Sequence, residues 1–407
     1  MKIKKATLHN RNFIVPISII GMMFFIIGFA LGINGLLIPF VKQALNISSA
    51  QSYLLLGVTK VVFVIFGYPS GLILKKIGYK KSMVFSFLFF SIGLLLFVPS
   101  AKFESFLLFL VASFIMGMGN TLLQTTVNPY ITIIGPKESA GKRICLMGIL
   151  NKLAWAVAPI ALSIFMDLGN VKIGQIITPF YLLAVIFVVL GAFSYFAPLP
   201  EINADGENVS KEENIVHESF NKTSIFQFPH LLLGVLAIFL YAGVEIISLS
   251  SMVDYANYLN LPHPERYTSY VVAFMIIGYL LGLTLVPKFI SQVWALRLCT
   301  AFGVLITTSL IFVSPSVSVW IVATFGLANA MVWPSIWPLA LDGLGKFTKT
   351  GSSLLVTGIV GGGILLFIFG FLKDLYGMQN AYLICLPSYI YLFYYSIAGY
   401  KMGREIV

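Results

Sequence analysis

The chain has 407 residues, of which 58% are hydrophobic and only 10% charged, and its mean hydropathy is +0.94. A soluble domain carries about a quarter of its residues as charges, so this composition excludes a soluble globular protein. The net charge of +11 does not indicate a nucleic-acid partner, because excess Lys and Arg in a multi-pass membrane protein collect in its cytoplasmic loops.

Apolar runs of about 20 residues, long enough to cross the hydrocarbon core of a bilayer, recur along the whole chain. Backbone groups in lipid must be paired within their own segment, so we expect helices. The first run is too long for the apolar core of a cleavable signal peptide, and more runs follow it. We predict twelve spans, at residues 14–40, 51–74, 82–100, 104–134, 143–166, 175–197, 229–253, 266–289, 294–314, 316–341, 350–372 and 379–400.

The basic residues of the loops test this count. With the N-terminus in the cytoplasm, nineteen Lys and Arg residues fall in cytoplasmic segments and five in outer segments. Since positive charge favours the cytoplasmic side, the distribution predicts twelve spans with both termini in the cytoplasm.

A long polar insert, EINADGENVSKEENIVHESFNK at 201–222, divides the spans into two sets of six. Its composition is typical of a flexible linker. We therefore predict an N-terminal six-helix bundle at 1–200, a cytoplasmic linker at 201–227 and a C-terminal six-helix bundle at 228–407.

The two halves share an internal repeat. GMGNTLLQTTVNPY at 117–130 in the fourth span matches GLANAMVWPSIWPL at 326–339 in the tenth, with Gly, Asn and Pro aligned at a constant offset of 209. Two related halves are typical of alternating-access transporters, which bind substrate between the halves near the middle of the membrane.

The loop after the second span, GLILKKIGYKK at 71–81, resembles the signature loop of the major facilitator superfamily. Gly71 permits close helix packing, Gly78 permits the turn, and the basic cluster holds the loop inside. Lys75 stands where the family has an acid. The predicted gating loop therefore comprises Gly71, Lys76, Gly78, Lys80 and Lys81.

A closer resemblance covers almost the whole chain. INGLLIPF at 33–40, LLQTTVNPYITIIGPKES at 122–139, YAGVEI at 241–246 and WPSIWPLAL at 333–341 are similar to the fucose–galactose–glucose:proton symporters. The resemblance implies an all-α membrane protein, with twelve transmembrane helices in two six-helix bundles around a central cavity. It also implies a monosaccharide substrate and a bacterial cytoplasmic (inner) membrane.

This chain lacks two carboxylates of the family pattern. Gly35 stands in place of an Asp in the first span, and Gln124 in place of a Glu in the fourth. Glu245, in the seventh span, is the acidic residue that lies well within a span, and an ionisable group there is a functional candidate. We predict that it carries the coupling proton. The alternative is a structural ion pair with Lys60 or Lys152, between which the sequence does not decide.

Three amides, Asn120, Gln124 and Asn128, lie on one stripe of the fourth span. Amides donate and accept hydrogen bonds, which suits sugar hydroxyls. Asn120 is expected to join helices, because its repeat partner is also Asn, whereas the other two are expected to bind substrate. Aromatic rings would stack on a pyranose. Asn151 in the fifth span matches a sugar-contacting Asn of the family, so the resemblance implies that it binds substrate as well. The predicted substrate-binding residues are Asn34, Gln124, Asn128, Asn151, Tyr241, Trp333 and Trp337.

The sequence therefore predicts alternating-access transport of a hexose such as glucose or galactose, with proton symport. An uncoupled or sodium-coupled sugar carrier is the alternative, and a membrane sugar sensor without turnover is a third reading. No nucleotide loop, metal-ligand cluster or nucleophile–base pattern is found, so we expect no enzyme activity, catalytic residue, cofactor, metal or nucleic-acid partner. The chain is expected to be a monomer in the lipid bilayer.

Overall fold

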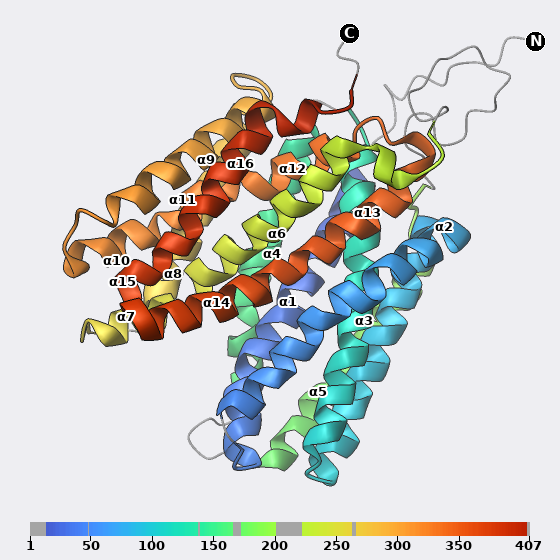
Figure 1. Cartoon of the computed structure of the whole chain (residues 1–407). Coiled ribbons are helices and arrows are strands. Elements are labelled where there is room, and N and C mark those ends of the chain that lie inside the picture. The colour runs from blue at the N-terminus through green and yellow to red at the C-terminus, as the bar shows by residue number, and fades with distance from the viewer. Residues whose placement is uncertain are drawn as a thin grey trace, which may run out of the picture.

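The computed structural model describes residues 14–47, 49–136, 139–165, 172–200, 222–262 and 266–404, and within these ranges the chain is helical with no strand (Figure 1). Most of the predicted linker, residues 201–221, lies outside the described ranges. The helices are α1 (Ile14–Ala44), α2 (Ser49–Lys102), α3 (Phe106–Ile133), α4 (Ala140–Ser163), α5 (Ile177–Phe196), α6 (Pro229–Ser250), α7 (Met252–Tyr258), α8 (Tyr267–Leu285), α9 (Gln292–Ser309), α10 (Pro315–Ala323), α11 (Phe325–Ala330), α12 (Val332–Leu341), α13 (Thr348–Thr357), α14 (Gly361–Tyr376), α15 (Met378–Ala381) and α16 (Cys385–Ile397).

Eight segments of the described chain are long and apolar enough to cross a membrane. One of them, Gly57–Lys102, contains two predicted spans, because α2 is interrupted at Gly78, where φ is 81°. A side chain there would be strained, whereas glycine adopts this conformation freely. The other three predicted spans correspond to α4, to α9 and to the segment of α15 and α16. The chain therefore has the twelve-span fold predicted from its sequence.

The outer faces of the helices are apolar. On α5, for example, Val185, Val188 and Val189 are each more than half exposed. Such a surface would be a liability in water, but it is the surface that lipid-facing helices require.

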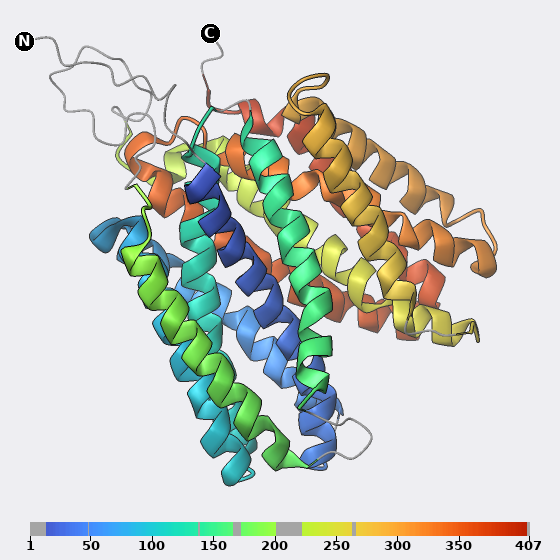
Figure 2. The ribbon, with the colours of Figure 1, turned by 180° about the vertical axis from the view of Figure 1, so that it is seen from behind.

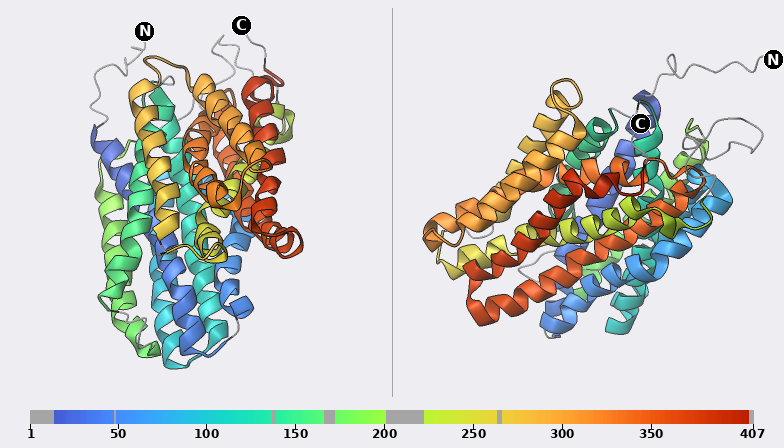
Figure 3. Two further views of the ribbon diagram at one scale, coloured as in Figure 1. Left: turned by 90° about the vertical axis from the view of Figure 1, so that its left-hand side faces the viewer. Right: turned by 45° about the horizontal axis from the view of Figure 1, so that its top comes forward.

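The helices form two groups, α1–α5 and α6–α16, which Figures 1 and 2 show from opposite sides and Figure 3 shows side by side. The groups touch at the end where α1 begins and α16 ends, and they diverge away from it (Figure 1). Near that end α13 packs on α2 and α3, and α12 packs on α4. The contact is close, because Ser352 Oγ donates a hydrogen bond to the Thr125 carbonyl oxygen at 2.8 Å.

The internal repeat is visible in the packing. A Cβ added at Gly117 would lie 3.1 Å from the Val62 side chain, and one added at Gly326 would lie 2.0 Å from the Val271 carbonyl oxygen. The two glycines are 209 positions apart, and so are the two valines. In each half, therefore, the repeat glycine lets the fourth span approach the second span of the same half closely.

Candidate functional site

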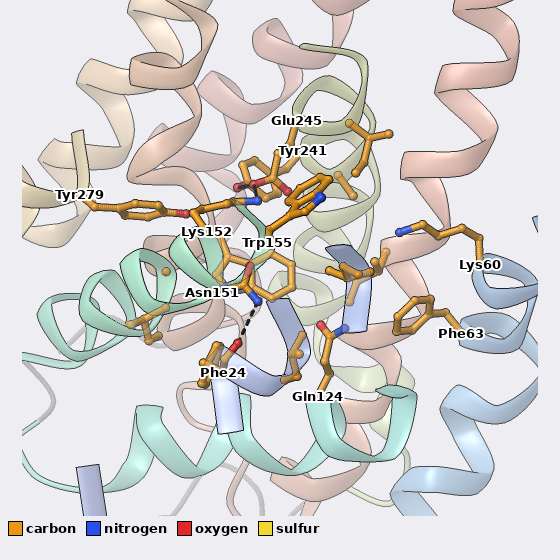
Figure 4. A pocket seen from close by; sticks show the side chains of 18 residues that line it. Phe24, Lys60, Phe63, Gln124, Asn151, Lys152, Trp155, Tyr241, Glu245 and Tyr279 are labelled. Atoms are coloured by element: carbon orange, nitrogen blue, oxygen red, sulfur yellow. Dashed lines mark hydrogen bonds and ion pairs between the residues drawn. The ribbon is translucent and has the colours of Figure 1, made fainter. Parts of the chain in front are cut away.

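A cavity of about 100 Å³ lies between the two groups of helices (Figure 4). A single water needs roughly 10–15 Å³ by this measure, so the cavity has room for several waters. Helices α1, α2, α3 and α4 line it from the first group, and α6, α8 and α12 line it from the second. Both halves of the molecule therefore line the same cavity.

An ion pair crosses this cavity. Lys152 Nζ on α4 lies 3.1 Å from Glu245 Oε1 on α6, and the two side chains are 7% and 15% exposed. The hydroxyl of Tyr241, one turn earlier on α6, donates a hydrogen bond to the same carboxylate oxygen at 2.8 Å. The sequence left two possible lysine partners open, and the structure selects Lys152. The pair joins the two halves of the molecule directly.

Lys152 also lies over an aromatic ring. Its Nζ is 4.8 Å from the centroid of the Trp155 ring, which is within the range of a cation–π interaction. The Glu245 carboxylate and the Trp155 indole both interact with this ammonium.

Two predicted amides line the cavity. Asn151 Nδ2 donates to the Phe24 carbonyl oxygen of α1 at 3.1 Å (Figure 4). This contact exists because α1 and α4 pack tightly: a Cβ added at Gly28 would lie 2.0 Å from the Asn151 carbonyl oxygen. Gln124 on α3 donates from Nε2 to Asn120 Oδ1 at 3.0 Å, so its own amide oxygen remains available to a ligand.

Aromatic side chains form another part of the lining. Trp333 lies in the first turn of α12, just after the helix break at Met331. Its ring centroid is 5.9 Å from that of Tyr241 and 5.4 Å from that of Trp337. Trp333 and Tyr241 line the cavity, as predicted.

Lys60 on α2 also lines the cavity. The sequence allowed it to extend towards the outer membrane surface, but it is only 8% exposed. Its Nζ lies 5.8 Å from the centroid of the Phe63 ring.

Two predicted substrate-binding residues of the described chain, Asn128 and Trp337, do not join this lining. Asn128 and Trp337 are buried one turn beyond Gln124 and Trp333, towards the end where the two groups of helices touch. Within the described chain, Asn128 Oδ1 and Trp337 Nε1 have no hydrogen-bond partner. Neither side chain lines the cavity in this conformation, and their role in substrate binding stays a prediction. The side chain of Asn34 lies outside the described part of the structure.

The repeat asparagines have different partners. Asn329 joins three spans, because it accepts from the Tyr389 hydroxyl at 3.0 Å and donates to Ser248 Oγ at 3.4 Å. The hydrogen bond of Asn120 runs to Gln124 on its own helix. The expectation that Asn120 joins helices is therefore not met, whereas its partner has that role.

Tyr279 on α8 lines the cavity and was missed by the sequence reasoning. Its ring fits against Gly148 of α4, where an added Cβ would lie 2.7 Å from the Tyr279 Cζ atom. A contact between helices of opposite halves leaves no local pattern in the sequence, so no signal identified this residue.

Part of the predicted gating loop lies where the halves meet. A Cβ added at Gly71 would lie 2.5 Å from the Ser353 side chain of α13. Across the same contact, Lys349 Nζ lies 5.3 Å from the centroid of the Tyr79 ring, next to Gly78. The remaining predicted residues of this loop are Lys76, Lys80 and Lys81.

Comparison with known proteins gives consistent matches. The model of the Major Facilitator Superfamily matches residues 20–367. The chain is 31% identical to the glucose/galactose transporter of Brucella abortus, over 97% of this chain and 96% of that one. It is 24% identical to the L-fucose-proton symporter of Escherichia coli, over 91% and 89%. A crystal structure of the E. coli fucose:proton symporter superposes with a TM-score of 0.82 at 22% identity, covering 97% of this chain and all of that one.

Proposed function

The chain belongs to the major facilitator superfamily, and from this premise we propose that it carries a monosaccharide across the bacterial cytoplasmic membrane by alternating access, together with a proton. The observation that carries the proposal is the cavity that both halves line, in which an ion pair, two amides and aromatic rings converge. Such a mixture of apolar walls and a few placed polar groups is typical of small-molecule sites.

The side chains that line the cavity suit a sugar as the substrate. Gln124 and Asn151 offer amide groups for hydroxyls, and Trp333, Trp155 and Tyr241 offer faces for the apolar side of a pyranose. The relatives named glucose/galactose transporter and L-fucose-proton symporter support a hexose-sized ring.

Glu245 is the group proposed to carry the proton. It is the acidic residue among those that line the cavity in the described chain. A proton on its carboxylate would remove the ion pair with Lys152 and with it a direct link between the halves. The alternatives are an uncoupled and a sodium-coupled carrier, and uptake under an imposed pH gradient distinguishes them from symport.

The loop charges support cytoplasmic termini, and the groups of helices touch at the end where α1 begins. In this orientation the structure is closed towards the cytoplasm.

We assign the N-terminal bundle to 1–200, the linker to 201–227 and the C-terminal bundle to 228–407. A monomer suffices for the proposal, since one chain supplies both halves of the cavity.

Replacing Trp333 by Ala should raise the KM for the transported sugar about tenfold or more, because large aromatic anchors in buried sites carry much of the binding energy. Trp294→Ala is a matched control, because Trp294 lies on α9 and is 56% exposed. Initial uptake rates in proteoliposomes measure both. An unchanged KM for Trp333→Ala would show that this ring does not bind the transported sugar.

Replacing Gly71 by Val should slow transport, because the new side chain meets Ser353 when the halves close on each other. Overpacking of this kind costs about 1–3 kcal/mol, which corresponds to a roughly 5–150-fold shift in the balance between conformations. Gly57→Val is the control on the same helix, since nothing lies within 4 Å of a Cβ added there. Equal transport rates for the two variants would contradict a gating role for this contact.

Counterflow tests the function itself. The full chain is reconstituted into liposomes loaded with an unlabelled monosaccharide, and entry of the labelled sugar is followed. Exchange of at least one monosaccharide is expected, and it would exclude a sensor without turnover. No exchange over a panel of neutral and acidic monosaccharides would overturn the proposal.

A further inference from the structure

The cavity contains an ammonium group that makes no ion pair at contact distance within the described chain. Lys60 is 8% exposed, and within the described chain its contact is with the Phe63 ring, with no ion pair or hydrogen bond to its Nζ. Figure 4 shows this ammonium and the Gln124 amide pointing into the cavity from α2 and α3. Tyr241, Glu245 and Lys152 lie on the other side of the same space. A buried charge is costly unless it is paired.

The charges around the cavity do not balance. Lys60, Lys152 and Glu245 are the charged side chains among its described lining residues. Glu245 is already bound, because it accepts from Tyr241 at 2.8 Å and pairs with Lys152 at 3.1 Å. One positive charge, that of Lys60, is therefore left over in a space where a ligand fits.

We propose that Lys60 binds the carboxylate of an acidic monosaccharide, so that the site also accepts a hexuronate or a related sugar acid and prefers it to the neutral hexose of the same configuration. The inference rests on the proposed transport function and specifies its substrate class. A single carboxylate matches the single excess positive charge. A sugar phosphate, with a charge of about −1.5 to −2 at neutral pH, would overcompensate it.

The remaining lining fits such a sugar. The indoles and amides of the site suit a pyranose ring and its hydroxyls, as they do for a neutral hexose. The acidic group adds an ion pair that a neutral hexose cannot form. Proton binding would also favour it: once Glu245 takes up a proton, Lys152 loses its counter-charge, and the cavity becomes more positive. Sugar and proton then strengthen each other's binding, as thermodynamic linkage requires of any such pair.

Substrate competition tests the inference. The counterflow assay is run with D-glucuronate and D-galacturonate beside D-glucose and D-galactose, with glucose 6-phosphate as a further competitor. We expect kcat/KM for a hexuronate to exceed that of its neutral counterpart about 30-fold or more, in line with the loss when one member of a buried charge pair is removed. Exchange of neutral hexoses without the acids would overturn the inference but not the transport function. Preferred exchange of the phosphate would overturn the choice of a carboxylate.

Variants of Lys60 separate charge recognition from folding. Lys60→Met should lose hexuronate transport about 30-fold or more, whereas Lys60→Arg should retain most of it. Lys102→Met is the control, because Lys102 ends the same helix α2 and is exposed. Thermal unfolding in detergent gives a readout without transport: hexuronate should raise the Tm of the wild type and of Lys60→Arg, but not that of Lys60→Met. Equal protection of wild type and Lys60→Met by hexuronate would contradict the assignment.

Discussion

Replacing Glu245 by Gln should abolish sugar accumulation driven by a pH gradient while sugar exchange continues. A gradient of one pH unit is worth about 1.4 kcal/mol per proton, or about tenfold accumulation in a one-to-one symport. The wild type should therefore accumulate sugar about tenfold when the membrane potential is clamped, and Glu245→Gln should only equilibrate it. The amide keeps the size of the carboxyl group and can still accept from the Tyr241 hydroxyl, but it cannot take up a proton.

Two measurements make this result specific. Counterflow by Glu245→Gln shows that the variant is folded and still moves sugar. Asp374→Asn is the matched control, because Asp374 is exposed on α14 and outside the cavity lining. Persistent tenfold accumulation by Glu245→Gln would place the coupling group elsewhere.

Replacing Lys152 by Met should have the second large effect. Glu245 would lose the partner that lies 3.1 Å away and would remain as an uncompensated buried charge, which costs about 3–5 kcal/mol. The carboxyl group can avoid this cost by holding a proton. We therefore expect lower thermal stability and loss of gradient-driven accumulation, with exchange retained.

The double variant Lys152→Met/Glu245→Gln tests the reason for that loss. Removing both charges leaves neither member of this pair without its partner, so the Tm of the double variant should recover most of the difference from the wild type. Because the two residues are in contact, their effects should be strongly non-additive. Additive losses of stability would show that the two side chains act separately and not as a pair.

The sequence predicted the fold well, because the bilayer imposes strong constraints on each span. The apolar runs and the loop charges were sufficient for twelve spans, although α2 runs through two of them with a break at Gly78 alone. The repeat of Gly117 and Gly326 predicted related halves, and their packing against Val62 and Val271 follows the same offset.

The site was predicted less completely, because contacts between the halves leave no trace in local patterns. Periodicity identified Tyr241 and Glu245 on one face, and their hydrogen bond follows from the spacing of four. The choice of Lys152 over Lys60, and the place of Tyr279 against Gly148, depend on how α4 lies against α6 and α8. Asn128 and Trp337 share a stripe with cavity residues, yet both are buried one turn beyond the lining. A stripe identifies a face of a helix but not the depth at which a cavity ends.

The most direct test of the account is the proton movement that accompanies sugar entry. The sugar that exchanges in counterflow is added to de-energised proteoliposomes in weakly buffered medium, and the external pH is recorded. We predict that sugar addition makes the medium more alkaline in the wild type, and that Glu245→Gln gives no pH change while still admitting sugar. Sugar entry into wild-type proteoliposomes without any pH change would contradict proton symport.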